Sequence, residues 1–256
     1  MPSTAHALLN HFYQSTPLIL GHRGASGNAP MNTLSAFLLA HQEGAHGIEL
    51  DVHLSADGVP VVIHDHTVDA TTNGKGEVRN MTVHQLKQLD AGSWFSSAFA
   101  KETIPTLTEV LTTLPRENFL INVEIKATRQ HRLQLVQATL AAIETTQSSE
   151  RVIISSFDPF ILRLVARSNA QIPIGYLHYP SIPFWIPWFM SGVRHEAIHP
   201  YYKQVNKQYV QQFTERGYKI HTWTVNDVEV ARELTALGVG AIITDYPERI
   251  REAIQS

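Results

Sequence analysis

The 256-residue sequence contains no cysteine, which excludes disulfide bonds, thiolate metal sites and cysteine nucleophiles. It also lacks an apolar run of roughly 18 residues, so we expect no membrane-spanning helix. An excess of positive charge is missing too, because 20 basic residues stand against 23 acidic ones and the net charge is −3. Such a chain offers no basic surface for nucleic acid.

The first residues, Met1 to Thr16, lack the long apolar core of a secretory signal peptide. They carry polar side chains instead, among them His6, Asn10 and His11. We therefore expect a cytoplasmic protein.

Short β-branched runs alternate with longer amphipathic segments, a pattern typical of a parallel α/β fold. The predicted strands are Leu18–His22, Gly47–Val52, Val61–His64, Phe119–Glu124, Val152–Ser155, Ile172–Leu177, Ala197–His199, Tyr218–Thr222 and Ala241–Thr244. The predicted helices begin near Thr33, Thr82, Thr106, His131, Asp158, Lys203, Asp227 and Tyr246. With Val61–His64 as an extra piece, the other strands predict a (β/α)₈ TIM barrel in a single domain covering residues 1–256.

Two segments interrupt this alternation. Residues 53–100 are too many for one strand-to-helix loop and include the turn signal Asn73–Gly76, so we expect a small insert after the second strand. The segment Pro180–Met190 is rich in aromatic residues and broken by prolines, and it cannot form one regular helix.

Chemically active residues cluster where the predicted strands end. The active site of a TIM barrel lies at the carboxyl ends of its strands, so we expect these side chains to surround one opening. They are His22, Arg23, Glu49, Asp51, Glu124, Lys126, Phe157, His199 and Trp223. For His199, a hydrogen-bonded structural histidine is at least as good an interpretation. His64 joins them if the insert folds back over the opening.

Glu49 and Asp51 are two residues apart on one strand and face the same way. With Glu124 they offer three hard oxygen ligands, which suit one divalent cation, Mg²⁺ or Ca²⁺. The alternative is a salt bridge from Glu124 to Lys126 or Arg23.

His22 and His64 could serve as a proton-donating and proton-accepting pair, because imidazole titrates near neutral pH. Asp65 could orient one of them. The alternative is two structural histidines bound to backbone carbonyls.

Arg23 and Lys126 are suited to bind phosphate, although either could instead neutralise the carboxylates. Phe157 and Trp223 could form an apolar wall, or simply pack in the core. Thr244–Pro247 is interpreted as strand-end capping and the start of a helix, without a catalytic role.

Taken together, these residues resemble the glycerophosphodiester phosphodiesterase family, in its bacterial cytosolic form. The resemblance covers residues 18 to 250. The matching motifs are Gly21–Ala25, Ala29–Pro30 with Asn32–Thr33, Glu49–Val52, Asp57–Gly58, Pro60–Asp65, Ile104–Leu107, Asn122–Lys126, Ser156–Phe157, Trp223–Asn226 and Thr244–Pro247.

The resemblance implies hydrolysis of glycerophosphocholine, glycerophosphoethanolamine and similar diesters to glycerol 3-phosphate and an alcohol, through a cyclic phosphate. It implies acid–base roles for His22 and His64, and a divalent cation held by Glu49, Asp51 and Glu124. Arg23 and Lys126 would contact the phosphate.

One position departs from the family motif Pro-Glu-Asn-Thr, because Met31 replaces the glutamate. A thioether is a poor ligand for a hard cation. Two alternatives therefore stay open: a barrel that binds phosphodiesters with impaired catalysis, and a lysophospholipid-cleaving phosphodiesterase of the same fold. The second would use the Pro180–Met190 loop, for which shallow membrane contact is the weaker prediction beside a dimer contact or local packing. The chain is expected to be a monomer or a homodimer.

Overall fold

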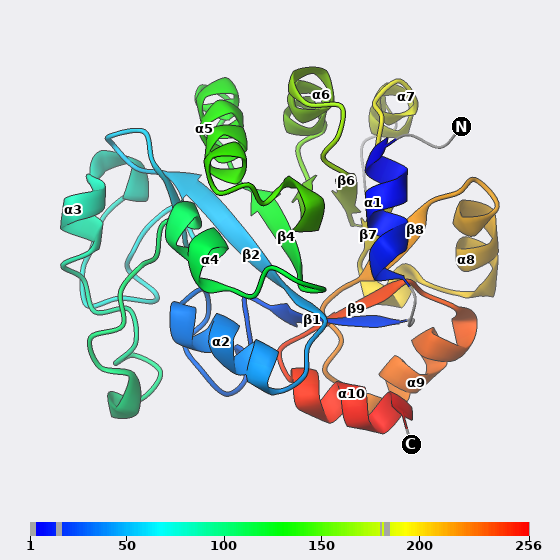
Figure 1. Cartoon of the computed structure of the whole chain (residues 1–256), viewed down its shortest axis with the longest axis horizontal. Coiled ribbons are helices and arrows are strands. Elements are labelled where there is room, and N and C mark those ends of the chain that lie inside the picture. The colour runs from blue at the N-terminus through cyan, green and yellow to red at the C-terminus, as the bar shows by residue number, and fades with distance from the viewer. Residues whose placement is uncertain (1–3, 14–16, 180, 182–184, 256) are drawn as a thin grey trace.

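A computed structural model describes residues 4–13, 17–179, 181 and 185–255. Within these residues, eight parallel strands form a closed barrel surrounded by helices (Figure 1). The strands are β1 (Leu18–His22), β2 (Gly47–Leu54), β4 (Leu120–Ile125), β5 (Val152–Ser156), β6 (Ile174–His178), β7 (Ala197–Pro200), β8 (Lys219–Thr222) and β9 (Ala241–Thr244). The predicted (β/α)₈ TIM barrel is confirmed.

The barrel closes through β1, which pairs in parallel with both β2 and β9. Gly21 lies beside Ile48 on one side and beside Thr244 on the other. The remaining strands follow in chain order, each beside its neighbour in sequence. This register brings the carboxyl ends of the first and last strands together, so residues more than 200 positions apart in the chain can meet at one opening.

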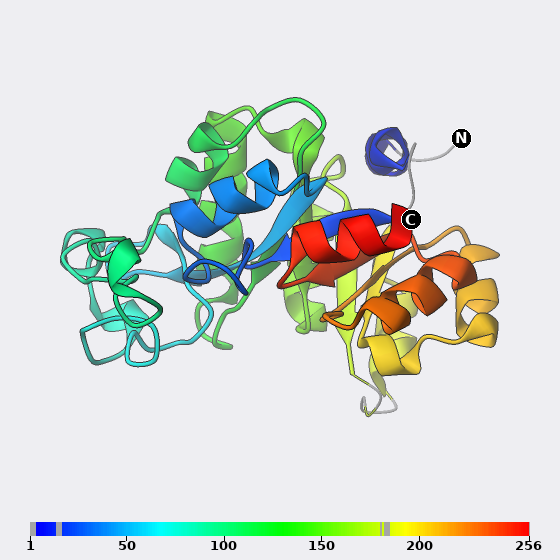
Figure 2. The ribbon, with the colours of Figure 1, turned by 90° about the horizontal axis from the view of Figure 1, so that it is seen from below.

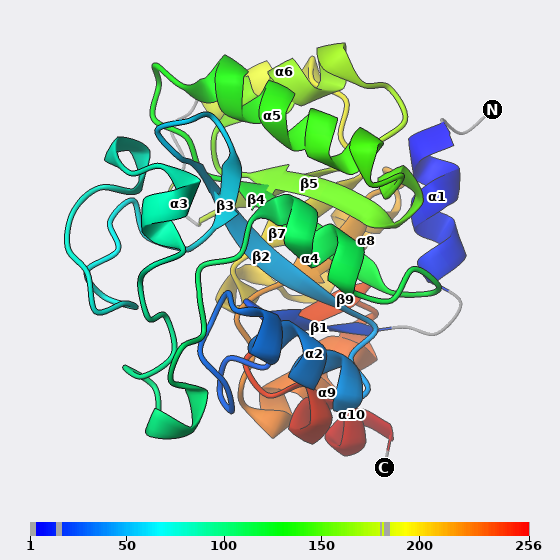
Figure 3. The ribbon, with the colours of Figure 1, turned by 60° about the vertical axis from the view of Figure 1, so that its left-hand side comes forward.

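The surrounding helices are α2 (Leu34–Gln42), α4 (Leu107–Thr113), α5 (Arg132–Thr145), α6 (Pro159–Ser168), α7 (Trp185–Ser191), α8 (Lys207–Thr214), α9 (Val228–Leu237) and α10 (Pro247–Gln255). Figure 3 shows α2, α4, α5 and α6 along the outside of the strands. Four expected N-caps accept a backbone N–H in the first turn: Thr33, Thr106, Asp158 and Asp227. Side-chain oxygens at these positions satisfy donors that a helix leaves unpaired.

One helix begins later than expected. We predicted a helix from near Lys203, but Tyr202–Gln204 form only a short 3₁₀ turn, η4. The helix α8 starts at Lys207, where the Asn206 side chain accepts from the Tyr209 N–H at 2.9 Å. The amide of Asn206 is a better cap than Lys203 could provide.

The expected insert lies between β2 and α4. It contains β3 (Pro60–Val62), η1 (Val78–Asn80), α3 (Val83–Leu86) and η2 (Ser97–Phe99). Strand β3 runs antiparallel to the outer half of β2, so it extends the sheet without joining the barrel. A separate apolar cluster including Val68, Val78 and Leu86 holds the insert together. The insert stands to the left of the barrel in Figure 1.

An N-terminal helix, α1 (Thr4–Phe12), was not predicted. Its Leu9 is buried among the first residues of several strands, including Leu18, Leu120 and Ala241. The helix therefore covers the amino end of the barrel, and Figures 1 and 2 show it on the side away from the insert. No helix in the described part of the chain is long and apolar enough to cross a membrane.

Part of the segment Pro180–Met190 lies outside the described residues, namely positions 180 and 182–184. Beyond them, Trp185–Ser191 forms the short helix α7. Pro187 fits there because it falls in the first turn, where a backbone N–H would have no partner within the helix. The side chain of Trp188 is 79% exposed.

Candidate active site

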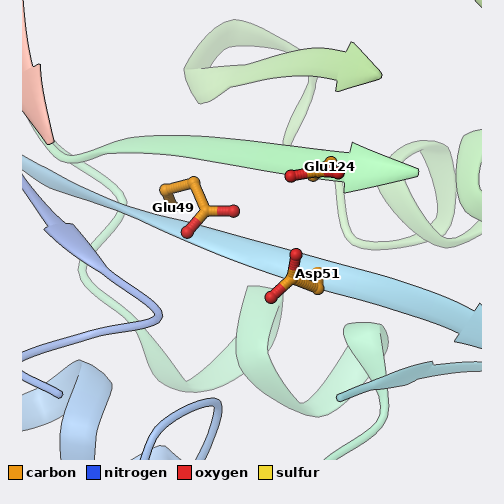
Figure 4. Close-up of side chains that lie close together, drawn as sticks. All are labelled: Glu49, Asp51 and Glu124. Atoms are coloured by element: carbon orange, nitrogen blue, oxygen red, sulfur yellow. The ribbon is translucent and has the colours of Figure 1, made fainter. Parts of the chain in front are cut away.

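The three carboxylates predicted to hold a metal meet at the carboxyl end of the barrel. Glu49 and Asp51 lie on β2 and Glu124 lies on β4, directly beside Asp51 in the register of the two strands (Figure 4). All three are buried, and one oxygen of each lies within 4.8 Å of the others. Alternation along a strand turns residues 49 and 51 to the same face, the interior of the barrel.

The chain around this cluster bends through left-handed backbone conformations. Arg23 and Gly24, just after β1, have φ of 55° and 87°, and Asn32 has φ of 59°. The bend lets the Arg23 backbone N–H donate to Glu49 Oε2 at 3.1 Å. It also brings the Asn32 amide within 2.9 Å of Asp51 Oδ2. Asparagine tolerates this conformation better than most residues.

Two cationic side chains contact the cluster from the open side. Lys126 Nζ lies 2.9 Å from Asp51 Oδ1 and 3.7 Å from Glu124 Oε1, and Arg23 Nε lies 3.4 Å from Asp51 Oδ2. Burial alone would raise the pKa of Asp51, but Lys126 and Arg23 outweigh it and hold that pKa at about 2. The expected alternative, a salt bridge, is therefore present, but its main partner is Asp51.

The other two carboxyl groups have raised pKa values, so they hold a proton more readily than a free carboxyl group does. Burial, followed by repulsion from Asp51, raises the pKa of Glu124 to about 8. The same two causes, in the same order, raise the pKa of Glu49 well above its usual range. Three acidic groups face two cationic ones here, so the buried oxygens fit a bound divalent cation, which would favour their ionised forms.

His22 lies at the end of β1 and hydrogen-bonds through Nδ1 to Asp245 Oδ1 at 2.6 Å. Asp245 also accepts from Ser26 Oγ at 2.8 Å and from Asn226 Nδ2 at 2.5 Å. Burial acts to raise the pKa of Asp245, but these hydrogen bonds and the proximity of His22 lower it to about 2. The partner of His22 is thus an ionised carboxylate from the last strand of the barrel.

Sequence reasoning missed this contact, because Thr244–Pro247 was interpreted only as a cap. The capping contact exists as well, since Thr244 Oγ1 accepts from the Tyr246 N–H at 3.1 Å. The available signal was the position of Asp245 directly after a barrel strand, the same signal that identified Arg23 and Lys126.

His64 reaches the same opening from the insert. Its Nδ1 lies 2.7 Å from Asp65 Oδ1, and its carbonyl oxygen accepts from His53 Nε2 at 3.0 Å. Burial lowers the pKa of His64 more than the neighbouring Asp51 raises it. Each of the two expected acid–base residues therefore has one ring nitrogen bound to an aspartate, which leaves the other nitrogen for chemistry.

A cavity of about 90 Å³ brings the predicted residues together. Its lining includes His22, Arg23, Glu49, His64, Glu124, Lys126, Phe157 and Trp223. Asp51 lies beneath this surface and is only 1% exposed. The expectation that His199 surrounds the opening is wrong. Its side chain is fully buried inside the barrel, where its ring stacks on that of His221 with centroids 4.5 Å apart and lies against Gly175.

Aromatic rings form one wall of the cavity. Phe157 stacks on Tyr179 with ring centroids 5.0 Å apart, and Trp223 packs at a steep angle against both. The Trp223 ring is fixed by a hydrogen bond from Nε1 to the carbonyl of His199, 2.8 Å long. Tyr179 was not among the predicted residues, although it follows β6 by one position, just as Phe157 follows β5.

Met31 contacts the site through Arg23. The guanidinium Nη1 of Arg23 lies 3.3 Å from the Met31 sulfur. The position that departs from the family motif is therefore a neighbour of the arginine. A thioether is a weak hydrogen-bond acceptor, so this contact holds Arg23 loosely.

A barrel whose opening combines an acidic cluster, two cationic side chains and two histidines has the groups that hydrolysis of a phosphate ester requires. Residues 22–249 match the model of the Glycerophosphoryl diester phosphodiesterase family, and the chain belongs to that family of phosphoric diester hydrolases.

One relative and two solved structures illustrate the match. A glycerophosphodiester phosphodiesterase of Caldanaerobacter subterraneus subsp. tengcongensis is 42% identical over 91% of this chain and 96% of its own length. An Oleispira antarctica phosphodiesterase, solved in complex with the product sn-glycerol-3-phosphate, superposes with a TM-score of 0.89 at 33% identity, over 96% of this chain and 99% of its own. The Thermotoga maritima glycerophosphodiester phosphodiesterase is 29% identical with a TM-score of 0.75, over 93% of this chain and 99% of its own.

Proposed function

We propose that this protein hydrolyses glycerophosphodiesters, such as glycerophosphocholine and glycerophosphoethanolamine, to glycerol 3-phosphate and an alcohol. The observation that carries the proposal is the pair of aspartate-bound histidines, His22 and His64, facing one cavity with the acidic cluster. A protein that only bound phosphodiesters would need no acid–base pair. The Oleispira antarctica relative with bound sn-glycerol-3-phosphate supports the same product here.

Glu49, Asp51 and Glu124 would hold one divalent cation, Mg²⁺ or Ca²⁺, through their carboxylate oxygens. When bound, the cation would offset negative charge on the non-bridging oxygens of the phosphodiester. Arg23 and Lys126 add positive charge on the same side. Lys126 is tied to Asp51 at 2.9 Å, which fixes the direction of its ammonium group.

The two histidines carry the protons. One removes the proton of the glycerol 2-hydroxyl as its oxygen attacks phosphorus, and the other protonates the departing alcohol as its bond to phosphorus breaks. The product of this step is a cyclic phosphate. In the second step the roles reverse, and water opens the ring to leave glycerol 3-phosphate. Phe157 and Trp223 form an apolar wall against the carbon atoms of the substrate.

The first test measures glycerol 3-phosphate release from both diesters in the presence of Mg²⁺, Ca²⁺ or EDTA. We expect cation-dependent release by the wild type, and roughly 10²- to 10⁴-fold lower kcat in His22→Ala and in His64→Ala, since each removes an acid–base group. Circular dichroism and thermal melting check that both variants fold. Near-normal activity in both would overturn the assignment.

Two outcomes of this test favour the alternatives. Release from lysophospholipids alone would make the protein a lysophospholipid-cleaving phosphodiesterase, with the exposed Trp188 as the feature that supports it. Saturable binding without turnover would make it a binding barrel, supported by Met31.

We further propose that residues 1–256 act as one unit, because His64 of the insert lines the same cavity as His22 of the barrel. A cytoplasmic location, a monomeric or homodimeric state and the absence of membrane contact stay predictions from the sequence.

A further inference from the structure

A second cavity lies beside the acidic cluster, on the side of the insert. Its volume is about 240 Å³, against about 90 Å³ for the cavity over the cluster. Its walls come from the outer end of β2, from the insert, and from the chain that leads from β4 into α5. Lys126 lines both cavities, so its side chain borders each of them.

Strand β2 leads from the acidic cluster to the second cavity. Asp51 and His53 face the same way on this strand and are about 7 Å apart along it. His53 lines the second cavity and donates through Nε2 to the carbonyl of His64 at 3.0 Å. A phosphodiester with its phosphorus at the acidic cluster would therefore have one of its two ester substituents within reach of the second cavity.

The second cavity is lined by groups that hydrogen-bond to hydroxyls. These are the imidazoles of His53, His66 and His131, the hydroxyl of Thr128 and the amide of Gln134. Each can donate to or accept from an alcohol.

The charged groups of this lining are already paired. Glu77 Oε2 lies 2.6 Å from Arg79 Nε, and Lys126 is held by Asp51. Among the described residues that line the cavity there is no phenylalanine, tyrosine or tryptophan. Proteins recognise quaternary ammonium groups through such aromatic faces, so the cavity is poorly suited to choline.

We infer that the second cavity binds the leaving alcohol of the substrate, and that it selects a polyhydroxylated alcohol such as glycerol or inositol over choline or ethanolamine. The inference rests on the proposed function and adds the substrate class. His66, Glu77 and Arg79 come from the insert, which thereby becomes the element that sets specificity. Loops and insertions commonly carry specificity on a rigid barrel.

The test compares kcat/KM for four substrates: glycerophosphoinositol, glycerophosphoglycerol, glycerophosphocholine and glycerophosphoethanolamine. The variant is Gln134→Trp, which places a large ring into the cavity from the exposed face of α5. The matched control is Gln137→Trp, one turn farther along the same helix, where the side chain is exposed and does not line the cavity.

For the wild type we expect kcat/KM for the two polyol esters to exceed that for glycerophosphocholine about tenfold, a preference that a few hydrogen bonds supply. Gln134→Trp should lower kcat/KM about tenfold for the polyol esters and by a smaller factor for glycerophosphoethanolamine, whose shorter alcohol makes fewer contacts in the cavity. Gln137→Trp should change neither. Free inositol should inhibit the wild type more strongly than it inhibits Gln134→Trp.

Two results would overturn the inference while leaving the proposed function intact. One is equal turnover of all four esters by the wild type, and the other is an equal loss on all four in Gln134→Trp. Absence of hydrolysis with every ester and either cation would overturn both the inference and the proposed function.

Discussion

His22 and Asp245 are 223 residues apart in the chain, and their side chains meet at 2.6 Å where the first and last strands of the barrel end side by side. The carboxylate accepts from one ring nitrogen and so directs the other toward the cavity. Asp245 is therefore a positioning residue for the proposed acid–base pair.

Replacing Asp245 by alanine should lower kcat roughly 100-fold, within the range that a positioned acid–base group contributes. KM should change little, because Asp245 is not among the residues that line the substrate cavity. Steady-state kinetics separate the two parameters. The control is Ser26→Ala, which removes a different hydrogen bond to the same carboxylate and should cost far less. A rise in KM with unchanged kcat in Asp245→Ala would contradict the positioning role.

The acidic cluster predicts how stability depends on pH without a cation. The pKa of Glu124 is about 8 in the folded protein, against about 4.3 in an unfolded chain. Between these values Glu124 binds more protons in the folded state than in the unfolded state, so its contribution to the free energy of unfolding should fall as pH rises through this window. Thermal melting in EDTA between pH 5 and 8 measures this. Buried histidines such as His199 and His221 have lowered pKa values and act in the opposite direction, so the test compares the wild type with Glu124→Gln. The melting temperature of the wild type relative to that of Glu124→Gln should fall as pH rises, and a constant difference would refute the prediction.

Cation binding should reverse that loss of stability. Mg²⁺ or Ca²⁺ should raise the melting temperature more at pH 8 than at pH 5, because at the lower pH protons compete for the same oxygens. Asp51→Asn should weaken the cation effect, because it removes a charged ligand. Equal shifts at both pH values would show that the cation binds away from the cluster.

Replacing Met31 by the glutamate of the family motif should hold the Arg23 guanidinium more firmly in place. A carboxylate in place of the Met31 sulfur would accept a charge-assisted hydrogen bond from the guanidinium, and we expect Met31→Glu to raise kcat/KM about fivefold, or about 1 kcal/mol. Met31→Gln provides a neutral side chain of similar length and should have a smaller effect. A decrease in kcat/KM for Met31→Glu would mean that the carboxylate draws Arg23 away from the substrate.

The interior of the barrel should be sensitive to one added methyl group. A Cβ at Gly175 would lie 2.3 Å from His199 Nε2, and both positions are on neighbouring strands. We expect Gly175→Ala to destabilise the protein by about 1–3 kcal/mol, as overpacking of cores does. At Gly192 the nearest atom to a new Cβ is 3.7 Å away, so Gly192→Ala should be close to neutral in the same denaturant titration.

Local signals in the sequence were sufficient for most of the fold. Thr33, Thr106, Asp158 and Asp227 each act over two or three residues, and their effect can be predicted from a short window. The strand-end rule for barrels then placed His22, Glu49 and Glu124 at one opening without knowledge of any contact.

The features that were missed depend on contacts between distant parts of the chain. The role of Asp245 depends on barrel closure beside His22. Helix α1 is stabilised by burial of Leu9 against the amino ends of several strands, and its own sequence gives little sign of that surface. His199 ended a predicted strand, yet its ring stacks on His221 of the neighbouring strand and is fully buried, a contact that no short window of sequence shows.

The raised pKa values of Glu49 and Glu124 also mean that, without a bound cation, these carboxyl groups retain protons at pH values where a free carboxyl group has lost them. Near pH 7 the carboxyl group of Glu124 is protonated, and a cation that takes its oxygens must displace that proton into solution. The heat measured by titration calorimetry should therefore depend on the ionisation enthalpy of the buffer. Comparing phosphate-free buffers of low and high ionisation enthalpy would count the protons released per ion, and the apparent affinity should strengthen as the solution becomes more alkaline.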